Sequence, residues 1–237
     1  GQYVNNSDQN ANENNTNGIS RRASVNSHNW YGILANFNNR ISSDLTIDFG
    51  VDLRKYKGYH YRRVNDRLGG DVYQETDNRN NPNQLFSETY NDEEKIDYYN
   101  TGLVNWLGLF GQVEYNFTED ITGFVQGALS NQGFAREEFF NEVPAAKTDF
   151  ENILGGNVKG GVNWNVDARN NFFANAGYYS KQPLFDAVYI NFGNNLNPNL
   201  TNEKITGFEL GYGYRSSKFR ANVNLYYTSW KDRFEST

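Results

Sequence analysis

The sequence predicts an all-β fold, a portion of an antiparallel transmembrane β-barrel. Three observations predict it: strict alternation of apolar and polar residues, connections that alternate between short and long, and aromatic residues at both strand ends. The run 45–54 alternates without one exception. Neighbouring side chains of an extended strand face opposite sides, so this run has one apolar and one polar face, which no helix could separate. The same pattern recurs at 158–166, 208–214 and 219–225.

The alternation indicates eight strands. We expect them at about 28–40, 45–59, 102–117, 121–131, 156–166, 171–181, 205–214 and 219–231. Turns rich in Asp, Asn and Ser join them in pairs at 41–44, 118–120, 167–170 and 215–218, and long loops follow at 60–101, 132–155 and 182–204. Since antiparallel strands reverse direction each time, all short turns fall at one end of the sheet. Short periplasmic turns and long extracellular loops are typical of outer-membrane barrels.

Two observations favour a barrel in a membrane over a soluble fold. The polar face has charged residues, as a wet lumen would, at Asp48, Asp52, Arg54, Glu114, Lys159, Glu209 and Arg220. Aromatic residues gather near the short turns (Phe37, Tyr115, Phe117, Trp164, Tyr212, Tyr214, Phe219) and near the long loops (Trp30, Tyr31, Tyr56, Tyr59, Trp106, Tyr178, Tyr179, Tyr227, Trp230). Two such levels match the interfacial girdles of a membrane barrel. The alternative is a soluble sandwich or lipocalin-like barrel in which the aromatics are simply β-formers.

Composition narrows the function classes. The chain has 237 residues, 37% hydrophobic residues and a mean hydropathy of -0.82, but its aromatic content of 16% argues against disorder. The formal charge of -6 disfavours a nucleic-acid partner, and the absence of cysteine excludes disulfides and thiolate metal sites. The Asn-rich segment 1–27 is expected to be an extracellular loop or arm, and 28–237 to hold the barrel strands and their loops.

No catalytic constellation is visible, so we expect neither an enzyme nor a cofactor. The chain has two histidines, His28 at the start of the first strand and His60 after the second. Antiparallel pairing across the 41–44 turn brings them to a similar level, where they could bind a transition metal. Two histidines without a third ligand make a weak site. We therefore expect two exposed rim residues and no metal.

The best candidates for ligand contact are residues at the rim that can stack and donate hydrogen bonds. Guanidinium groups bind carboxylates or phosphates, and aromatic faces suit sugars or hydrophobic chelators. The predicted ligand-binding residues are Tyr59, Tyr61, Arg62, Arg63, Arg136, Tyr178 and Tyr179. The alternative for each of them is ordinary loop packing or contact with lipopolysaccharide.

Several segments resemble the carboxyl half of the barrel in TonB-dependent outer-membrane receptors, particularly of Bacteroidetes type. They are HNWYGILANF, DLRKYKGYHYRRV, GLFGQVEYNF, NVKGGVNWNV, FFANAGYYSKQPLFDAV and NEKITGFELGYGYRSSKFRANVNLYYTSWKDRF. The resemblance implies a barrel of 22 strands in the bacterial outer membrane, plugged by an amino-terminal domain through which the TonB complex acts. It also implies uptake of a small nutrient, of the siderophore, corrinoid, glycan or peptide class, and contact with outer-membrane lipid and lipopolysaccharide.

The chain departs from this pattern in extent. It has about a third of the strands, no recognisable plug and no TonB box, so we expect it to be a piece of a longer protein. Two other functions remain open from the sequence. One is a self-contained eight-stranded outer-membrane barrel that acts as an anchor or adhesin, since eight strands suffice for closure. The other is a soluble carbohydrate-binding β protein.

Overall fold

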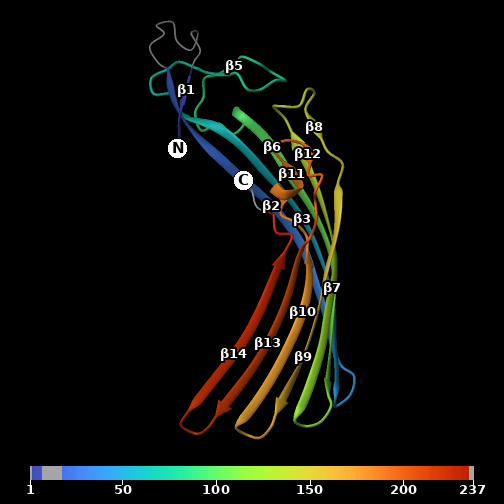
Figure 1. Cartoon of the computed structure of the whole chain (residues 1–237). Coiled ribbons are helices and arrows are strands. Elements are labelled where there is room, and N and C mark those ends of the chain that lie inside the picture. The colour runs from blue at the N-terminus through green and yellow to red at the C-terminus, as the bar shows by residue number, and fades with distance from the viewer. Residues whose placement is uncertain (1, 7–17, 235–237) are drawn as a thin grey trace.

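The structure, a computed structural model, describes residues 2–6 and 18–234. It is dominated by one curved antiparallel sheet in the order β1-β2-β3-β6-β7-β9-β10-β13-β14 (Figure 1). The eight long strands are β2 (Ile19–Arg40), β3 (Leu45–Asp66), β6 (Lys95–Asn116), β7 (Ile121–Glu138), β9 (Glu151–Asn165), β10 (Asn170–Lys181), β13 (Glu203–Arg215) and β14 (Arg220–Lys231). Within the described residues β14 and β2 do not pair with each other, so the sheet is an open wall and not a closed eight-stranded barrel.

The smaller elements lie at the upper end of this wall in Figure 1. They are β1 (Gln2–Asn5), β4 (Tyr73–Glu75), β5 (Gln84–Phe86), β8 (Ala146–Lys147), α1 (Phe185–Val188), β11 (Tyr189–Ile190) and β12 (Asn195–Leu196). β1 pairs with the start of β2, and β8 pairs with the end of β7. No helix in the described part of the chain is long and apolar enough to span a bilayer.

The eight predicted strands are confirmed, but the upper boundaries of five of them are wrong. The strands extend further than expected: β2 begins at Ile19, β3 ends at Asp66, β6 begins at Lys95, β7 ends at Glu138 and β9 begins at Glu151. Much of the predicted loops 60–101 and 132–155 is therefore strand. Alternation of apolar and polar residues is lost in these extensions, where side chains of both faces are buried (Tyr61 and Val64), while the backbone hydrogen bonds between strands continue. Part of the predicted arm, residues 7–17, lies outside the described residues.

The four predicted short turns are confirmed at the lower end of the sheet. Each has a side-chain oxygen that accepts hydrogen bonds from the backbone two or three residues further on, as turn-forming Ser, Thr and Asp do. Thr118 Oγ1 accepts from the N–H groups of Asp120 (3.2 Å) and Ile121 (3.1 Å). Asp167 Oδ1 accepts from the N–H of Arg169 at 2.7 Å. These local bonds explain why composition alone located the turns.

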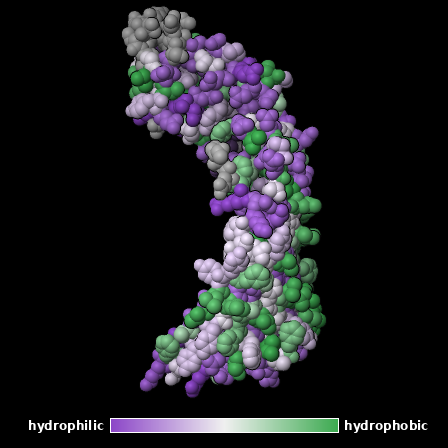
Figure 2. All heavy atoms as spheres, in the orientation of Figure 1, coloured by the Kyte–Doolittle hydropathy of each residue, from purple (hydrophilic) through white to green (hydrophobic). Residues whose placement is uncertain are grey.

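The outer face of the lower wall is apolar and exposed. In the register, Leu53 lies between Ile33 and Leu107, and side chains opposite each other share a face. Further along this face Leu129 is 73% exposed and Leu154 is 74% exposed. Figure 2 shows hydrophobic side chains gathered over the lower part of the molecule and mostly hydrophilic ones at its upper end. This band of apolar side chains is the lipid-facing surface of a transmembrane barrel wall.

The buried cores lie at the upper end, where the loops fold onto the inner face. One core joins Val64 of β3 and Ile96 of β6 to Tyr73 and Phe86 of the small β4–β5 hairpin. A second joins Phe134 of β7 to Val188 and Tyr189 of the segment after β10. The register places Phe134 opposite Val104 and therefore on the polar, inner side of the wall. Both loops thus cover the lumen side of the rim and hold it in shape.

Candidate functional site

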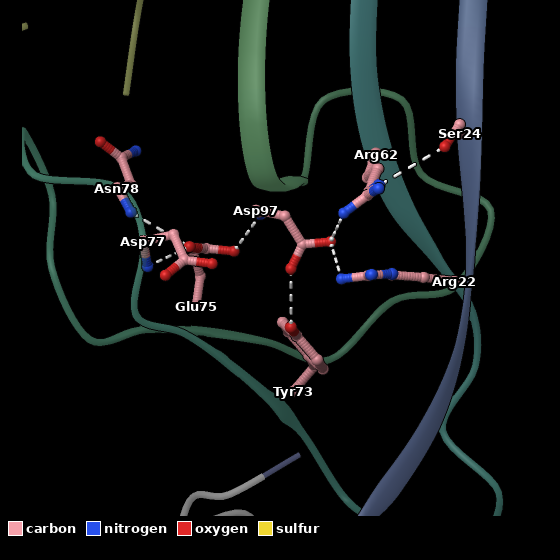
Figure 3. Close-up of polar contacts among 8 residues, drawn as sticks. All are labelled: Arg22, Ser24, Arg62, Tyr73, Glu75, Asp77, Asn78 and Asp97. Carbon is pink, nitrogen blue, oxygen red and sulfur yellow. Dashed lines mark hydrogen bonds and ion pairs between the residues drawn. The ribbon is translucent and has the colours of Figure 1, made fainter. Parts of the chain in front are cut away.

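The upper inner face of the wall carries a buried ion network centred on Asp97 (Figure 3). Asp97 lies in β6 at a register shift opposite Tyr61 and Arg62, and its φ of 63° is in the left-handed region that Asp tolerates. A bulge of this kind redirects a side chain. Its Oδ2 accepts from Arg22 Nη1 at 2.5 Å and from Arg62 Nη1 at 3.4 Å. Three strands, β2, β3 and β6, are thereby joined by one carboxylate.

The same network fixes the loop between β3 and β6. Tyr73 donates its hydroxyl to Asp97 Oδ1 at 3.4 Å. Glu75, 1% exposed, accepts from the backbone N–H of Asp97 at 2.7 Å and of Asn78 at 3.0 Å. Burial raises the pKa of Glu75, as does the nearby Asp97 carboxylate, against the opposing backbone hydrogen bonds. Burial likewise raises the pKa of Tyr73.

A second buried ion pair fixes the loop between β10 and β13. Arg136 Nη2 lies 2.8 Å from Glu138 Oε2, and both side chains are almost fully buried. Arg136 also donates to the carbonyl of Phe192 at 2.7 Å and to Asn194 Oδ1 at 3.0 Å. Glu138 in turn accepts from the backbone N–H of Phe140 at 3.1 Å. The guanidinium thus binds the 182–202 connection to the top of β7.

Below these networks the inner wall forms an open cavity of ≈ 370 Å³. Its polar lining includes Asp52, Tyr179, Lys181 and Gln182. Trp106, also in the lining, buries its Nε1 without a hydrogen-bond partner in the described chain. Gln182 Nε2 is held by Ser130 Oγ at 2.7 Å. A concave site with an aromatic ring, a carboxylate, an ammonium and an unused donor can bind a polar ligand or a second protein segment.

The predicted ligand-binding residues do not converge on one site. Tyr59, Tyr61 and Arg63 have outward-facing positions, and Tyr61 and Arg63 contact Asp92. Tyr178 also faces outward, opposite Val158. The inward-facing members are Arg62 in the Asp97 network, Arg136 in the second ion pair and Tyr179 in the cavity. Neighbouring residues of a strand face opposite sides, so Arg62 and Arg63 serve different surfaces.

Sequence reasoning missed the residues that organise the rim. Asp97, Glu75 and Glu138 lie in segments predicted as loops or at their margins, where no periodicity distinguishes them. Their partners are far away in the chain, as with Arg22 and Asp97. The one available signal was the presence of acidic residues in long loops that also contain arginines and tyrosines.

The two histidines lie at a similar level, as the pairing across the first turn predicts, and the register places both on the inner face. Their ring centroids are 6.0 Å apart. Within the described chain, no group of three or more His, Cys, Asp or Glu residues is arranged to hold a metal ion.

The curved antiparallel wall, with an exposed apolar outer face and a polar inner face, defines the class: a section of a transmembrane β-barrel. The profile of the family described as "TonB dependent receptor-like, beta-barrel" matches residues 1–237, and the chain belongs to that family. Its fold is similar to the crystal structure of the ferric yersiniabactin uptake receptor FyuA from Yersinia pestis, with a TM-score of 0.53 at 11% identity. That match covers 90% of this chain and 32% of the receptor chain. A comparison with curated proteins gives no significant match.

Proposed function

We propose that this chain forms part of the barrel of a transporter in the bacterial outer membrane, which takes up a scarce nutrient with energy from the TonB complex. The transporter acts as a carrier and not as an enzyme. Membership of the TonB-dependent receptor family supports this general function. The resemblance in sequence supports the Bacteroidetes type, and the nutrient is of the siderophore, corrinoid, glycan or peptide class.

The observation that carries the proposal is the arrangement of the loops at the rim. Two loops fold inward over the lumen. Hydrogen bonds fix them to the charged groups of the ion pairs, one loop to Asp97 and the other to Arg136. Holding charged groups in a dry interior is costly and is weak evidence for stability alone. Loops fixed over a polar lumen are suited to receive a ligand from outside and pass it to a plug domain. Such a domain would be the part of the whole receptor that contacts TonB.

The predicted contact residues divide accordingly. We propose that Tyr179 contacts the ligand or the plug from the lumen wall, while Arg62 and Arg136 position the loops that do so. For Tyr59, Arg63 and Tyr178 the outward orientation supports the alternative role, contact with outer-membrane lipid and lipopolysaccharide. Aromatic and basic side chains together suit a membrane interface with anionic headgroups. Tyr61 is 6% exposed, which supports the other alternative, ordinary packing within the rim.

The test is to replace residues 67–94 by a short Gly-Ser linker in the full-length receptor. This range leaves β3 and β6 intact, whereas 60–101 includes paired strand. We expect normal insertion into the outer membrane and loss of nutrient-dependent growth. Growth is measured on a siderophore, a corrinoid, a glycan and a peptide source in turn, with Gly-Ser replacement of 41–44 as the matched control.

Normal uptake of every nutrient after replacement of 67–94 would contradict the proposal. If the replacement blocks insertion, the substitution Asp97→Asn decides, because it weakens the loop anchor without shortening the chain. We expect that variant to insert normally and to take up its nutrient more slowly.

A further inference from the structure

His28 of β2 and His60 of β3 form a pair on the lumen side of the wall. The register pairs His28 with Gly58 and His60 with Asn26, so both side chains lie on the inner face. Their ring centroids are 6.0 Å apart and the rings are nearly perpendicular, at 72°. Two imidazoles bound to one ion at about 2.0–2.1 Å from the metal have centroids roughly 5–6.5 Å apart. The spacing of the pair is therefore compatible with a shared metal ion.

Hydrogen bonds hold both rings by the same nitrogen. His60 Nδ1 lies 2.8 Å from Asn26 Oδ1. An amide oxygen can only accept, so Nδ1 of His60 carries the proton and the lone pair is on Nε2. His28 Nδ1 lies 2.7 Å from Tyr56 Oη, which can accept in the same way. Metal-binding histidines usually donate their second ring N–H to an oxygen of this kind, which fixes the ring and its tautomer.

Gly58, opposite His28, leaves room for the Tyr56 hydroxyl beside the pair. A Cβ at Gly58 would lie 3.1 Å from His60 Nε2 and would collide with the hydroxyl of Tyr56. Any larger residue at this position would thus displace the Tyr56 hydroxyl that holds His28 Nδ1. The carboxylate of Asp186 in α1 interacts electrostatically with His60 and offsets positive charge there. The nearby Arg136 is neutralised by its own ion pair with Glu138.

We propose that His28 and His60 bind one divalent transition-metal ion through their Nε2 atoms, with Asn26 and Tyr56 orienting the rings. Imidazole suits Cu²⁺, Ni²⁺ and Zn²⁺, and Cu²⁺ binds most tightly to a given nitrogen site. Two protein ligands leave the other coordination positions open to water or to an exchangeable ligand in the lumen. The proposal does not depend on the transport function, because a metal could be bound whether or not uptake occurs.

The test uses Cu²⁺ alone, titrated into the full-length receptor in detergent. Binding is followed by calorimetry and by the nitrogen hyperfine structure of the Cu²⁺ electron paramagnetic resonance spectrum. We expect the native protein to bind one equivalent more than the double variant His28→Gln/His60→Gln and to show two coordinated imidazole nitrogens at that site. The substitution Tyr31→Phe, on the same strand but on the outer face opposite Lys55, is the matched control and should leave this site unchanged.

Asn26→Leu keeps both imidazoles and removes the orienting oxygen of His60. Loss of such an orienting partner usually weakens metal binding about 10–100-fold, and we expect a loss in that range. Equal stoichiometry and identical spectra for the native protein and the double histidine variant would overturn the proposal. If that variant fails to insert, Asn26→Leu and Gly58→Ala decide, because unchanged Cu²⁺ affinity in both would equally overturn it. Uptake measured on the same variants reports separately on the transport proposal.

Discussion

The lower and upper parts of the same strands follow different rules. In β3, residues 45–53 alternate strictly and present an exposed apolar face, whereas 60–66 have no alternation and include the buried Tyr61 and Val64. The lower wall is stabilised by the backbone ladder and the surrounding lipid. The upper part is stabilised by its own loops, through two small cores and buried ion pairs. A single strand can thus belong to a membrane protein below and to a water-exposed, internally packed structure above.

The prediction with the largest expected effect tests whether the stability of the rim depends on its buried charges. Arg136→Ala leaves Glu138 buried and unpaired, and loss of one partner of such a pair usually costs about 3–5 kcal/mol. We expect faster hydrogen exchange in 182–202 and no change in the lower strands. The control Arg54→Ala removes a half-exposed pair with Asp52 and should cost less than about 1 kcal/mol. Equal protection of 182–202 in both variants would show that this ion pair does not hold the loop.

The second prediction tests the lower wall. Val51 shares the outer face with Leu109, while Asp52 lines the cavity. Val51→Arg puts a charge in the hydrocarbon and should destabilise folding in lipid vesicles by about 2–4 kcal/mol near the midplane. Asp52→Arg should cost much less. Cysteine labelling in intact outer membranes gives an independent check: modification at position 49 but not at 52 by a membrane-impermeant reagent would reverse the assignment of the faces.

The third prediction concerns pH and the loop anchored by Glu75. Burial raises the pKa of Glu75 above its ordinary value of 4.5, so the docked loop favours the protonated carboxyl. This contribution is fully present below pH 4.5 and is lost as the pH rises through the raised pKa. We expect hydrogen exchange to show that 67–94 opens severalfold more often as the pH rises through this pKa. In Glu75→Gln the opening frequency of 67–94 should depend less on pH, whatever the stability of the variant. An unchanged pH dependence would assign it to another group.

The smallest effect is expected at a short turn. Thr118→Ala removes two hydrogen bonds to backbone N–H groups in an exposed turn, which should cost about 0.5–1 kcal/mol in total. Thr118→Ser keeps the hydroxyl and serves as the control. The measurement is folding stability in lipid vesicles. A loss of folding stability as large as that of Val51→Arg would mean that the short turns, and not the lipid-facing wall, limit the stability of the lower end of the sheet.

The sequence by itself determined the lower wall. Alternation over 45–54 assigns the faces because the period of a strand is two and a slip of one residue would put Asp48 and Asp52 into lipid. The turn residues Thr118 and Asp167 act within three residues of themselves, so their role is readable locally.

Only the tertiary structure decided the rim. The strand extension beyond residue 59, the inward fold of the loops and the pairing of Arg22 with Asp97 depend on contacts between distant segments, which leave no period in the sequence. The same holds for the predicted ligand contacts, which the structure divides between two faces. Where a strand faces lipid, the lipid requires apolar side chains on one face, which imposes a simple alternation of apolar and polar residues. Above the lipid, the stability of each buried charge depends on a specific partner, and partners are brought together by folding alone.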